Sequence, residues 1–331
     1  MKQIVTLIAA VLTAAAAWAW DMPKAPAFLH PGDRIALISL GSTPQNNNPA
    51  LAAATLRKWG FDVVVGRHAL DRHRCYAGTA CERADDLLRA LRDPRVKAIV
   101  STRGGYGTSQ VLEYVPLDTL RKYPKWIVGY SDITAMHSAQ VCAGNMSLHA
   151  NMGGALGEFG PDNAINLMLR DILTGHLPAY EVPGNRHNQP GTAHGVLVGG
   201  NMAVFSNIAG SQDYDFLDRD QIRGRDIILF FEDVSENMAR VNSMLSQLKL
   251  KGVIGQVKAV IVGRFTDYKP AYGYADMNEM LSEYLQGYDI PICYDFPVSH
   301  DETWNYPMIE GCPVTLNVTT SKVTLTYDLA R

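Results

Sequence analysis

A short stretch around Ser131 has the pattern of a catalytic turn. Apolar residues from Trp126 to Val128 lead into Gly-Tyr-Ser-Asp, and helix-like spacing follows from Thr134. A buried strand that turns sharply into a helix exposes one side chain at the tip of the turn, and here that side chain is Ser131. The unpaired N–H groups at the start of the helix could hold a developing negative charge. A serine in this place is equally suited to capping the helix, so its role depends on partners elsewhere in the chain.

A serine nucleophile at neutral pH needs a general base, and the base needs a group that orients it. His300 and Glu232 each end a strongly apolar segment, Phe-Pro-Val-Ser-His and Leu-Phe-Phe-Glu. A carboxylate in such a place requires a partner or a solvated cleft, because burial alone is costly. Glu232 could accept the Nδ1 proton of His300, which would leave Nε2 able to take the proton of Ser131.

The same residue types also have simpler interpretations. His300 could be an ordinary loop histidine, and Glu232 could belong to a surface ion pair. Asp233 and Glu236 lie close to Glu232 in the sequence and are rival candidates for the orienting carboxylate. Spacing alone does not choose among them.

The elements that must position these residues alternate between two patterns. Apolar runs at 34–40, 61–65, 96–101 and 127–128 are separated by helix-like runs. This alternation predicts a parallel sheet with right-handed crossovers, of the flavodoxin-like or Rossmann-like type. Sites in such sheets lie at the carboxyl ends of the strands, where both Ser131 and the Arg103-Gly-Gly-Tyr-Gly107 loop fall. Their placement favours the catalytic interpretation of Ser131.

Composition along the chain indicates two domains. We expect an N-terminal α/β domain over residues 25–156 and an interdomain linker over residues 157–194, where Gly and Pro recur. A second domain over residues 195–331 contains both Glu232 and His300, and its segment from Pro313 to Tyr327 alternates like a closing hairpin. The sequence therefore predicts an α/β protein whose C-terminal domain is rich in β-structure.

The N-terminus has the pattern of an export signal. An alanine-rich apolar run from Ile4 to Trp20 follows Lys2, and Ala17-Trp18-Ala19 has the small-x-small form of a signal-peptidase site. The run is short for a membrane anchor, so we predict a signal peptide at residues 1–19 and no membrane span after cleavage. The mature protein should be exported, and periplasmic in a Gram-negative source. A formal charge of -3 argues against nucleic acid as the main partner.

The five cysteines do not predict a metal centre. Cys75 could pair with Cys81, and Cys293 with Cys312, but the distances that decide this are not readable from sequence. There is no Cys-x-x-Cys, and the nine histidines lie far apart along the chain, so we predict neither a metal site nor a cofactor. The Gly104–Gly107 loop lacks both Gly-x-Gly-x-x-Gly and a following Gly-Lys-Ser/Thr, which argues against nucleotide binding.

Several segments, taken together in their order along the chain, indicate a wider resemblance to a known family, which extends over residues 25–320. With them the chain resembles the LD-carboxypeptidase family of serine peptidases, which includes murein tetrapeptide carboxypeptidases and microcin C immunity proteins. The segments are Gly32-Asp-Arg-Ile-Ala, Tyr76-Ala-Gly-Thr, Asp93-Pro-Arg-Val-Lys-Ala-Ile, Arg103-Gly-Gly-Tyr-Gly, Gly129-Tyr-Ser-Asp-Ile-Thr, Leu197-Val-Gly-Gly-Asn-Met, Phe231-Glu-Asp-Val-Ser-Glu, Gln247-Leu-Lys-Leu, Val262-Gly-Arg-Phe and Phe296-Pro-Val-Ser-His.

The resemblance implies a Ser-His-Glu triad in a groove between the two domains. By position, Ser131 is the nucleophile, His300 the general base and then acid, and Glu232 the orienting group, which sets Asp233 aside. The implied oxyanion hole consists of the backbone N–H of Asp132 and that of one glycine in the 103–107 loop, for which we choose Gly105. A homodimer is also implied.

The implied reaction removes the terminal D-Ala from peptidoglycan tetrapeptides through an acyl-enzyme, so muropeptides are the expected partners. Arg103 is a candidate for binding the free carboxylate of the substrate, although an arginine at a strand end can also be structural. The alternative is a related serine peptidase that acts on a peptidyl-nucleotide antibiotic. A catalytically dead peptidoglycan-binding protein is a third reading, and the presence of all three triad residue types argues against it.

Two segments depart from the family pattern. His149-Ala150-Asn151 stands where the family often has His-Gly-Pro, and we expect this segment to line the site. The asparagine expected after the histidine appears one position late, at Asn305, and Tyr306–Gly311 replaces a simpler Leu/Pro pattern. We therefore expect the loop after His300 to be longer or reshaped.

Overall fold

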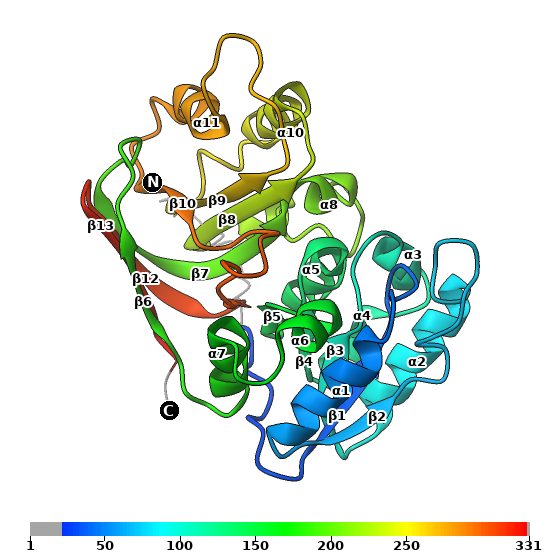
Figure 1. Ribbon diagram of the computed structural model, residues 1–331. Coiled ribbons are helices and arrows are strands. Elements are labelled where there is room, and N and C mark those ends of the chain that lie inside the picture. The colour runs from blue at the N-terminus through cyan, green and yellow to red at the C-terminus, as the bar shows by residue number, and fades with distance from the viewer. Residues whose placement is uncertain (1–21, 330–331) are drawn as a thin grey trace, which may run out of the picture.

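The computed structural model describes residues 22–329. The predicted signal peptide at residues 1–19 lies outside the described residues. Within them the chain forms two sheets, each with its own helices (Figure 1). The expected α/β class, with parallel strands in the N-terminal sheet, is confirmed.

The first sheet has six strands in the order β11-β5-β4-β3-β1-β2, and all but β11 run parallel. Its strands are β1 (Arg34–Ile38), β2 (Asp62–Val65), β3 (Val96–Ser101), β4 (Trp126–Gly129), β5 (Ser147–His149) and β11 (Met308–Glu310). The inner strands are apolar throughout because helices cover both faces of the sheet, and all four residues of β4 are buried.

The second sheet has seven strands in the order β10-β9-β8-β7-β12-β13-β6. The strands β7 to β10 are parallel, whereas β12, β13 and β6 add to β7 in antiparallel fashion. Its strands are β6 (Ala179–Pro183), β7 (Gly191–Asn201), β8 (Ile227–Val234), β9 (Ala259–Thr266), β10 (Ile292–Phe296), β12 (Pro313–Val318) and β13 (Lys322–Tyr327). The expected hairpin near the C-terminus is therefore present as β12–β13.

Both faces of β8 are buried, which explains its unbroken apolar sequence. Leu229 and Phe231 belong to a buried cluster with residues of α10 and α11, while Ile228 and Phe230, on the other face, belong to a cluster with residues of β12 and β13. Figure 1 shows α10 and α11 beside this sheet. Side chains alternate between faces along a strand, so a strand with two covered faces needs apolar residues at consecutive positions. Glu232 follows directly on this run and is carried into the interior with it.

The helices of the first half are α1 (Asn48–Lys58), α2 (Ala80–Arg92), α3 (Thr108–Leu112), α4 (Leu117–Lys122), the 3-10 turn η1 (Ser131–Ile133), α5 (Thr134–Cys142), α6 (Gly153–Phe159) and α7 (Ala164–Leu173). Those of the second half are α8 (Met202–Asn207), α9 (Arg219–Ile222), α10 (Met238–Leu250) and α11 (Met277–Leu285). None of the helices within residues 22–329 is long and apolar enough to cross a membrane.

The two halves of the chain are interleaved rather than merely adjacent. The strand β11 comes from the C-terminal half but pairs antiparallel with β5 at the edge of the first sheet. In the other direction, β6 lies within the segment expected as a linker and is an edge strand of the second sheet. The same segment contains α7. All five cysteines are unpaired in this structure, so neither Cys75–Cys81 nor Cys293–Cys312 is formed.

Candidate active site

The turn after β4 holds Ser131 in a strained backbone conformation. Its φ is +63°, in the left-handed region that residues other than glycine seldom adopt. Gly129 makes the turn possible, because a Cβ at that position would lie 2.7 Å from Cγ1 of Ile133. The helix α5 then begins at Thr134. A strained serine between a strand and a helix is the geometry of a nucleophile elbow, in which strain of about 1–3 kcal/mol is held by the surrounding fold.

His300 and Glu232 form a hydrogen-bonded pair. Nδ1 of His300 lies 2.6 Å from Oε2 of Glu232, whose side chain is fully buried. Burial by itself would lower the pKa of His300, but the charge of Glu232 and its hydrogen bond outweigh this, and the pKa is raised above 6.5. Because Nδ1 faces a carboxylate, it carries the proton of the neutral ring and Nε2 holds the lone pair.

The rival carboxylates have other partners. Asp233 accepts hydrogen bonds from Nδ2 of Asn201 and the backbone N–H of Ala203, each at 2.8 Å. Burial, together with the charge of Glu232, raises the pKa of Asp233 to about 6. Glu236 lies 4.0 Å from Arg240. Glu232 is thus the carboxylate at His300, and Asp233 instead helps to begin α8.

The ring of Tyr130 connects the histidine to the nucleophile turn. It meets the His300 ring edge-on, with 5.2 Å between centroids, and it directly precedes Ser131 in the chain. Nε2 of His300 is buried without a hydrogen-bond partner, so no bond to Oγ of Ser131 is formed here. Catalytic hydrogen bonds of this kind are often long in the absence of substrate and tighten when it binds.

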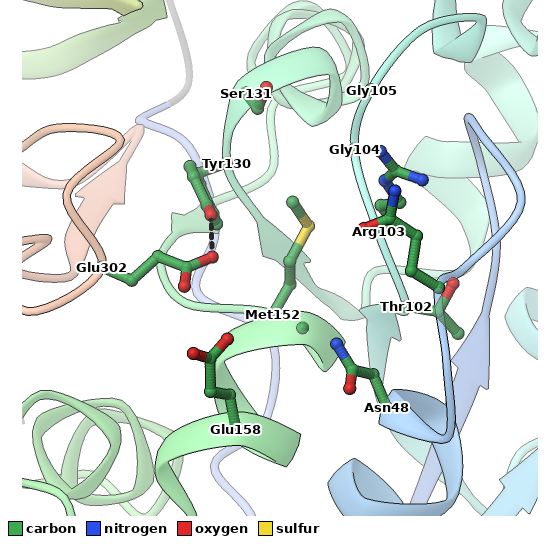
Figure 2. A pocket seen from close by; sticks show the side chains of 12 residues that line it. Asn48, Thr102, Arg103, Gly104, Gly105, Tyr130, Ser131, Met152, Glu158 and Glu302 are labelled. Atoms are coloured by element: carbon green, nitrogen blue, oxygen red, sulfur yellow. Dashed lines mark hydrogen bonds between the residues drawn. The ribbon is translucent and has the colours of Figure 1, made fainter. Parts of the chain in front are cut away.

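A pocket of about 250 Å³ opens at Ser131 (Figure 2). Its walls come from the ends of β3 and β4, from α6 and from the loop after His300. Arg103 lies on one side, and the carboxylates of Glu158 and Glu302 lie on the other. The lining residues are Gln45, Asn48, Thr102, Arg103, Gly104, Gly105, Tyr130, Ser131, Met152, Gly154, Glu158 and Glu302.

The structure brings the predicted Arg103 loop to the nucleophile turn. Gly104 makes the nearer approach, since a Cβ there would lie 3.1 Å from the Cβ of Ser131, and Gly105 follows it along the pocket wall. Arg103 donates from Nη1 to the carbonyl of Thr43 at 3.0 Å. It therefore has a structural bond in addition to its place on the pocket.

Asp132 ties this loop to the turn. Its carboxylate accepts hydrogen bonds from the backbone N–H and the hydroxyl of Thr108, at 2.8 and 2.7 Å. Burial raises the pKa of Asp132, although both hydrogen bonds act in the opposite direction. The Gly-rich loop, which ends at Thr108, is thereby held against the start of η1.

Sequence reasoning missed two acidic residues and one polar contact at the site. Glu158 and Glu302 were not singled out, although Glu302 lies two residues after His300 in the segment that departs from the family pattern. Oε1 of Glu302 accepts a hydrogen bond from the hydroxyl of Tyr130 at 2.5 Å (Figure 2).

The two departures from the family pattern meet in space. Nδ2 of Asn305 donates to Oδ1 of Asn151 at 3.3 Å, and Nδ2 of Asn151 donates to the carbonyl of Glu302 at 3.2 Å. Asn151 thus supports the loop after His300. None of the three residues His149, Ala150 and Asn151 is among the pocket residues, so the expectation that this segment lines the site is wrong, whereas its neighbours Met152 and Gly154 are among them.

Comparisons with known proteins follow the two halves of the chain. Residues 35–150 match the LD-carboxypeptidase N-terminal domain, and residues 194–316 match the LD-carboxypeptidase C-terminal domain. A putative carboxypeptidase of Synechocystis is 33% identical over 279 residues, which cover 83% of this chain and 88% of the relative. The chain belongs to the LD-carboxypeptidase family. It is accordingly a carboxypeptidase, a hydrolase of a serine-peptidase family.

Members of this family with more specific names are also similar. The murein tetrapeptide carboxypeptidase of Pseudomonas aeruginosa is 27% identical, covering 82% of this chain and 91% of that one. The muramoyltetrapeptide carboxypeptidase of Oxalobacter formigenes superposes with a TM-score of 0.77 at 28% identity, covering 89% and 98% of the two chains. The microcin C7 self-immunity protein MccF of Escherichia coli is 29% identical, covering 77% and 80%.

Proposed function

We propose that this protein removes the terminal D-Ala from peptidoglycan tetrapeptides with Ser131, His300 and Glu232 as its catalytic triad. The observation that carries the proposal is that Tyr130, the residue directly before the strained Ser131, meets the ring of the buried His300–Glu232 pair edge-on, while Tyr130 and Ser131 line one pocket. Nucleophile, base and orienting group thereby have the residue types that acyl transfer requires, and the bond between base and orienting group is already formed.

In the proposed mechanism, Oγ of Ser131 attacks the carbonyl carbon that precedes D-Ala while Nε2 of His300 takes its proton. The backbone N–H groups of Asp132 and Gly105 stabilise the oxyanion. His300 then protonates the amine of the leaving D-Ala, and an acyl-enzyme remains on Ser131. Water, activated by the same Nε2, releases the tripeptide. Glu232 keeps the histidine in the required tautomer and stabilises its cationic form.

The charges of the pocket favour a substrate that carries both a carboxylate and a cation. Arg103 offers a place for the carboxylate of D-Ala, and Glu158 and Glu302 offer one for the side-chain ammonium of a diamino acid (Figure 2). A related MccF structure contains aspartyl sulfamoyl adenosine, whose aminoacyl part is acidic. Two carboxylates in the pocket would repel such a group, so we favour the peptidoglycan substrate over the antibiotic alternative.

The proposal includes the place where the protein works. An export signal at residues 1–19 would deliver the mature enzyme to the periplasm of a Gram-negative cell, where peptidoglycan is directly accessible. A homodimer also remains a prediction, which size-exclusion chromatography with light scattering would test.

The test compares the purified protein and Ser131→Ala on two tetrapeptides that end in D-Ala. One carries a diamino acid at the third position, and the other carries norleucine, which lacks the ammonium. Mass spectrometry should detect loss of one D-Ala with the unaltered protein and none with Ser131→Ala. The diamino peptide should be the better substrate by about 10-fold or more, equivalent to about 1.4 kcal/mol.

Glu158→Gln and Glu302→Gln should lower the rate on the diamino peptide and leave the rate on the norleucine peptide nearly unchanged. Glu113→Gln is a suitable control because Glu113 is exposed and lies outside the pocket. Failure to release D-Ala from either peptide would reject the peptidoglycan substrate. Equal release by Ser131→Ala would reject the nucleophile.

A further inference from the structure

A second group of chemically active side chains lies buried in the protein, and none of its members lines the pocket. His137 on α5, His149 on β5 and Glu310 on β11 are each fully buried. One ligand atom from each of the three lies within 4.8 Å of those of the other two. His137 and His149 lie on successive elements of the chain, and Glu310 joins them because β11 pairs with β5 at the edge of the first sheet.

Two of the three side chains lack hydrogen-bond partners. Neither ring nitrogen of His149 and neither carboxylate oxygen of Glu310 makes a hydrogen bond. The amide of Asn305 is close to His149, and the backbone N–H of Gly199 is close to Glu310, but neither reaches hydrogen-bond geometry. Buried polar groups in native proteins are almost always paired, so four unpaired atoms in one place indicate a missing partner.

His137 is oriented as a metal ligand would be. Its Nε2–H donates to the carbonyl of Gly129 at 2.9 Å, which leaves the lone pair on Nδ1. Metal-binding histidines are commonly held in this way by a carbonyl or carboxylate on the other ring nitrogen. The hydroxyl of Ser147 lies 2.6 Å from Nδ1, but its single proton can instead go to the carbonyl of Ile127, at 3.1 Å.

The protonation states also suit a cation. Burial lowers the pKa of His137 to about 4 and that of His149 well below its usual value, so both rings are neutral and can donate a lone pair. Burial raises the pKa of the Glu310 carboxyl well above its usual range, because no positive charge faces it. A bound cation would supply that charge and keep Glu310 ionised.

We propose that His137, His149 and Glu310 form a structural site for one divalent transition-metal ion, with Zn²⁺ as the preferred occupant. Two imidazole nitrogens and a carboxylate oxygen are ligands that Zn²⁺ favours. Bonds of about 2.0–2.2 Å in a tetrahedral site place the ligand atoms about 3.3–3.6 Å apart. The three ligand atoms lie within 4.8 Å of one another, so no pair has to close by more than about 1.5 Å. A water molecule is available as the fourth ligand, or Ser147 once its Oγ, now 2.6 Å from Nδ1 of His137, moves about 1 Å away.

The location indicates what the ion does. The helix α5, which carries His137, starts three residues after Ser131, and β11, which carries Glu310, follows the loop of His300. An ion held by both elements would fasten the His300 loop to the nucleophile turn. The site does not depend on which peptide the enzyme cleaves, and no step of the proposed reaction passes through the metal.

The surface offers an instructive contrast. His68, Asp71 and Glu82 also lie within 4.8 Å of one another. Their bonds are already used, however, since His68 bonds Asp71 at 2.7 Å and Glu82 bonds Thr79 in the cap of α2. This group supplies a matched control, because it has similar residue types but its members already have hydrogen-bond partners.

The experiment measures metal content in the full chain, purified without a histidine tag from medium with zinc and dialysed against metal-free buffer. Plasma mass spectrometry should find about one zinc per chain. Glu310→Gln and His149→Asn should each reduce this to less than about one tenth, while His68→Asn should leave it unchanged. Thermal denaturation of the protein refolded with zinc should occur at a higher temperature than that of the protein refolded with chelator.

Anomalous diffraction at the zinc edge provides a check that does not depend on the folding of any variant. A peak between His137, His149 and Glu310 in the unaltered protein is the expected result. The proposal would be overturned if the unaltered protein contained no more zinc or other transition metal than Glu310→Gln does, and if the density among the three side chains showed only a water molecule.

Discussion

The nucleophile turn at residues 129–134 and the His300 loop at residues 297–307 meet at one pocket but are held by different means. The turn is local, because a buried strand, the contact between Gly129 and Ile133, and the start of α5 determine its shape. The loop is held by side chains remote in sequence, namely Glu232, Tyr130 and Asn151. The difference teaches that one half of the machinery is specified by neighbouring residues and the other by the packing of the two domains.

The largest effect should come from removing the charge that orients His300. Glu232→Gln should lower kcat by about 10³–10⁴-fold, because an amide does not hold the Nδ1–H tautomer or stabilise the imidazolium. Steady-state kinetics would measure this, with circular dichroism to confirm the fold. Asp233→Asn is the matched control, since Asp233 bonds Asn201 rather than the histidine, and it should lose less than about 10-fold in kcat.

A single methyl group added in the local turn should lower the free energy of unfolding of the protein. Gly129→Ala places a Cβ 2.7 Å from Ile133 and should cost about 1–3 kcal/mol in the free energy of unfolding. Urea denaturation measures this cost. Combining it with Ile133→Ala should cost less than the sum of the two single changes. Gly255→Ala, where nothing lies closer than 3.9 Å, is the control and should be nearly neutral. A strictly additive pair would contradict the local account.

The remote support of the His300 loop predicts coupling between Asn151 and Asn305. Each change to Ala leaves a buried amide without its partner, and a double-mutant cycle should give an interaction energy of about 0.5–3 kcal/mol. The cycle is measured by denaturation, and kcat should fall in parallel because the loop carries His300. Independent effects of the two changes would show that the loop does not depend on this bond.

The smallest effect should be a shift in pH dependence. The general base must be deprotonated, so the raised pKa of His300 places the acid limb of kcat/KM above pH 6.5. Glu302 contributes to that rise as a nearby negative charge. Glu302→Gln should therefore move the acid limb to lower pH, by less than about one unit, whereas Glu113→Gln should not move it. A shift toward higher pH would contradict the assigned sign.

Sequence patterns predicted much of this protein for identifiable reasons. The parallel strands of the first sheet are continuous apolar runs because helices cover them on both faces, and such runs are readable without coordinates. The turn at Ser131 and the β12–β13 hairpin are likewise local patterns. The bond between His300 and Glu232 was inferred from residue types and family resemblance, and the structure places the two side chains 2.6 Å apart.

Other features depend on contacts that no local pattern encodes. The exchange of β11 into the first sheet, the bond between Asn151 and Asn305, and the acidic side of the pocket all join segments that lie far apart in the chain. The prediction of no metal site rested on the wide spacing of the histidines, yet the fold brings His137 and His149 to Glu310.

The sequence by itself determined which residues could react and which strands must be buried, because side-chain chemistry and apolar periodicity are properties of neighbouring residues. Only the tertiary structure decided which of those residues face one another. Contacts between distant segments form when whole sheets and helices pack. Many residues contribute to the free energy of that packing, and no single position determines it.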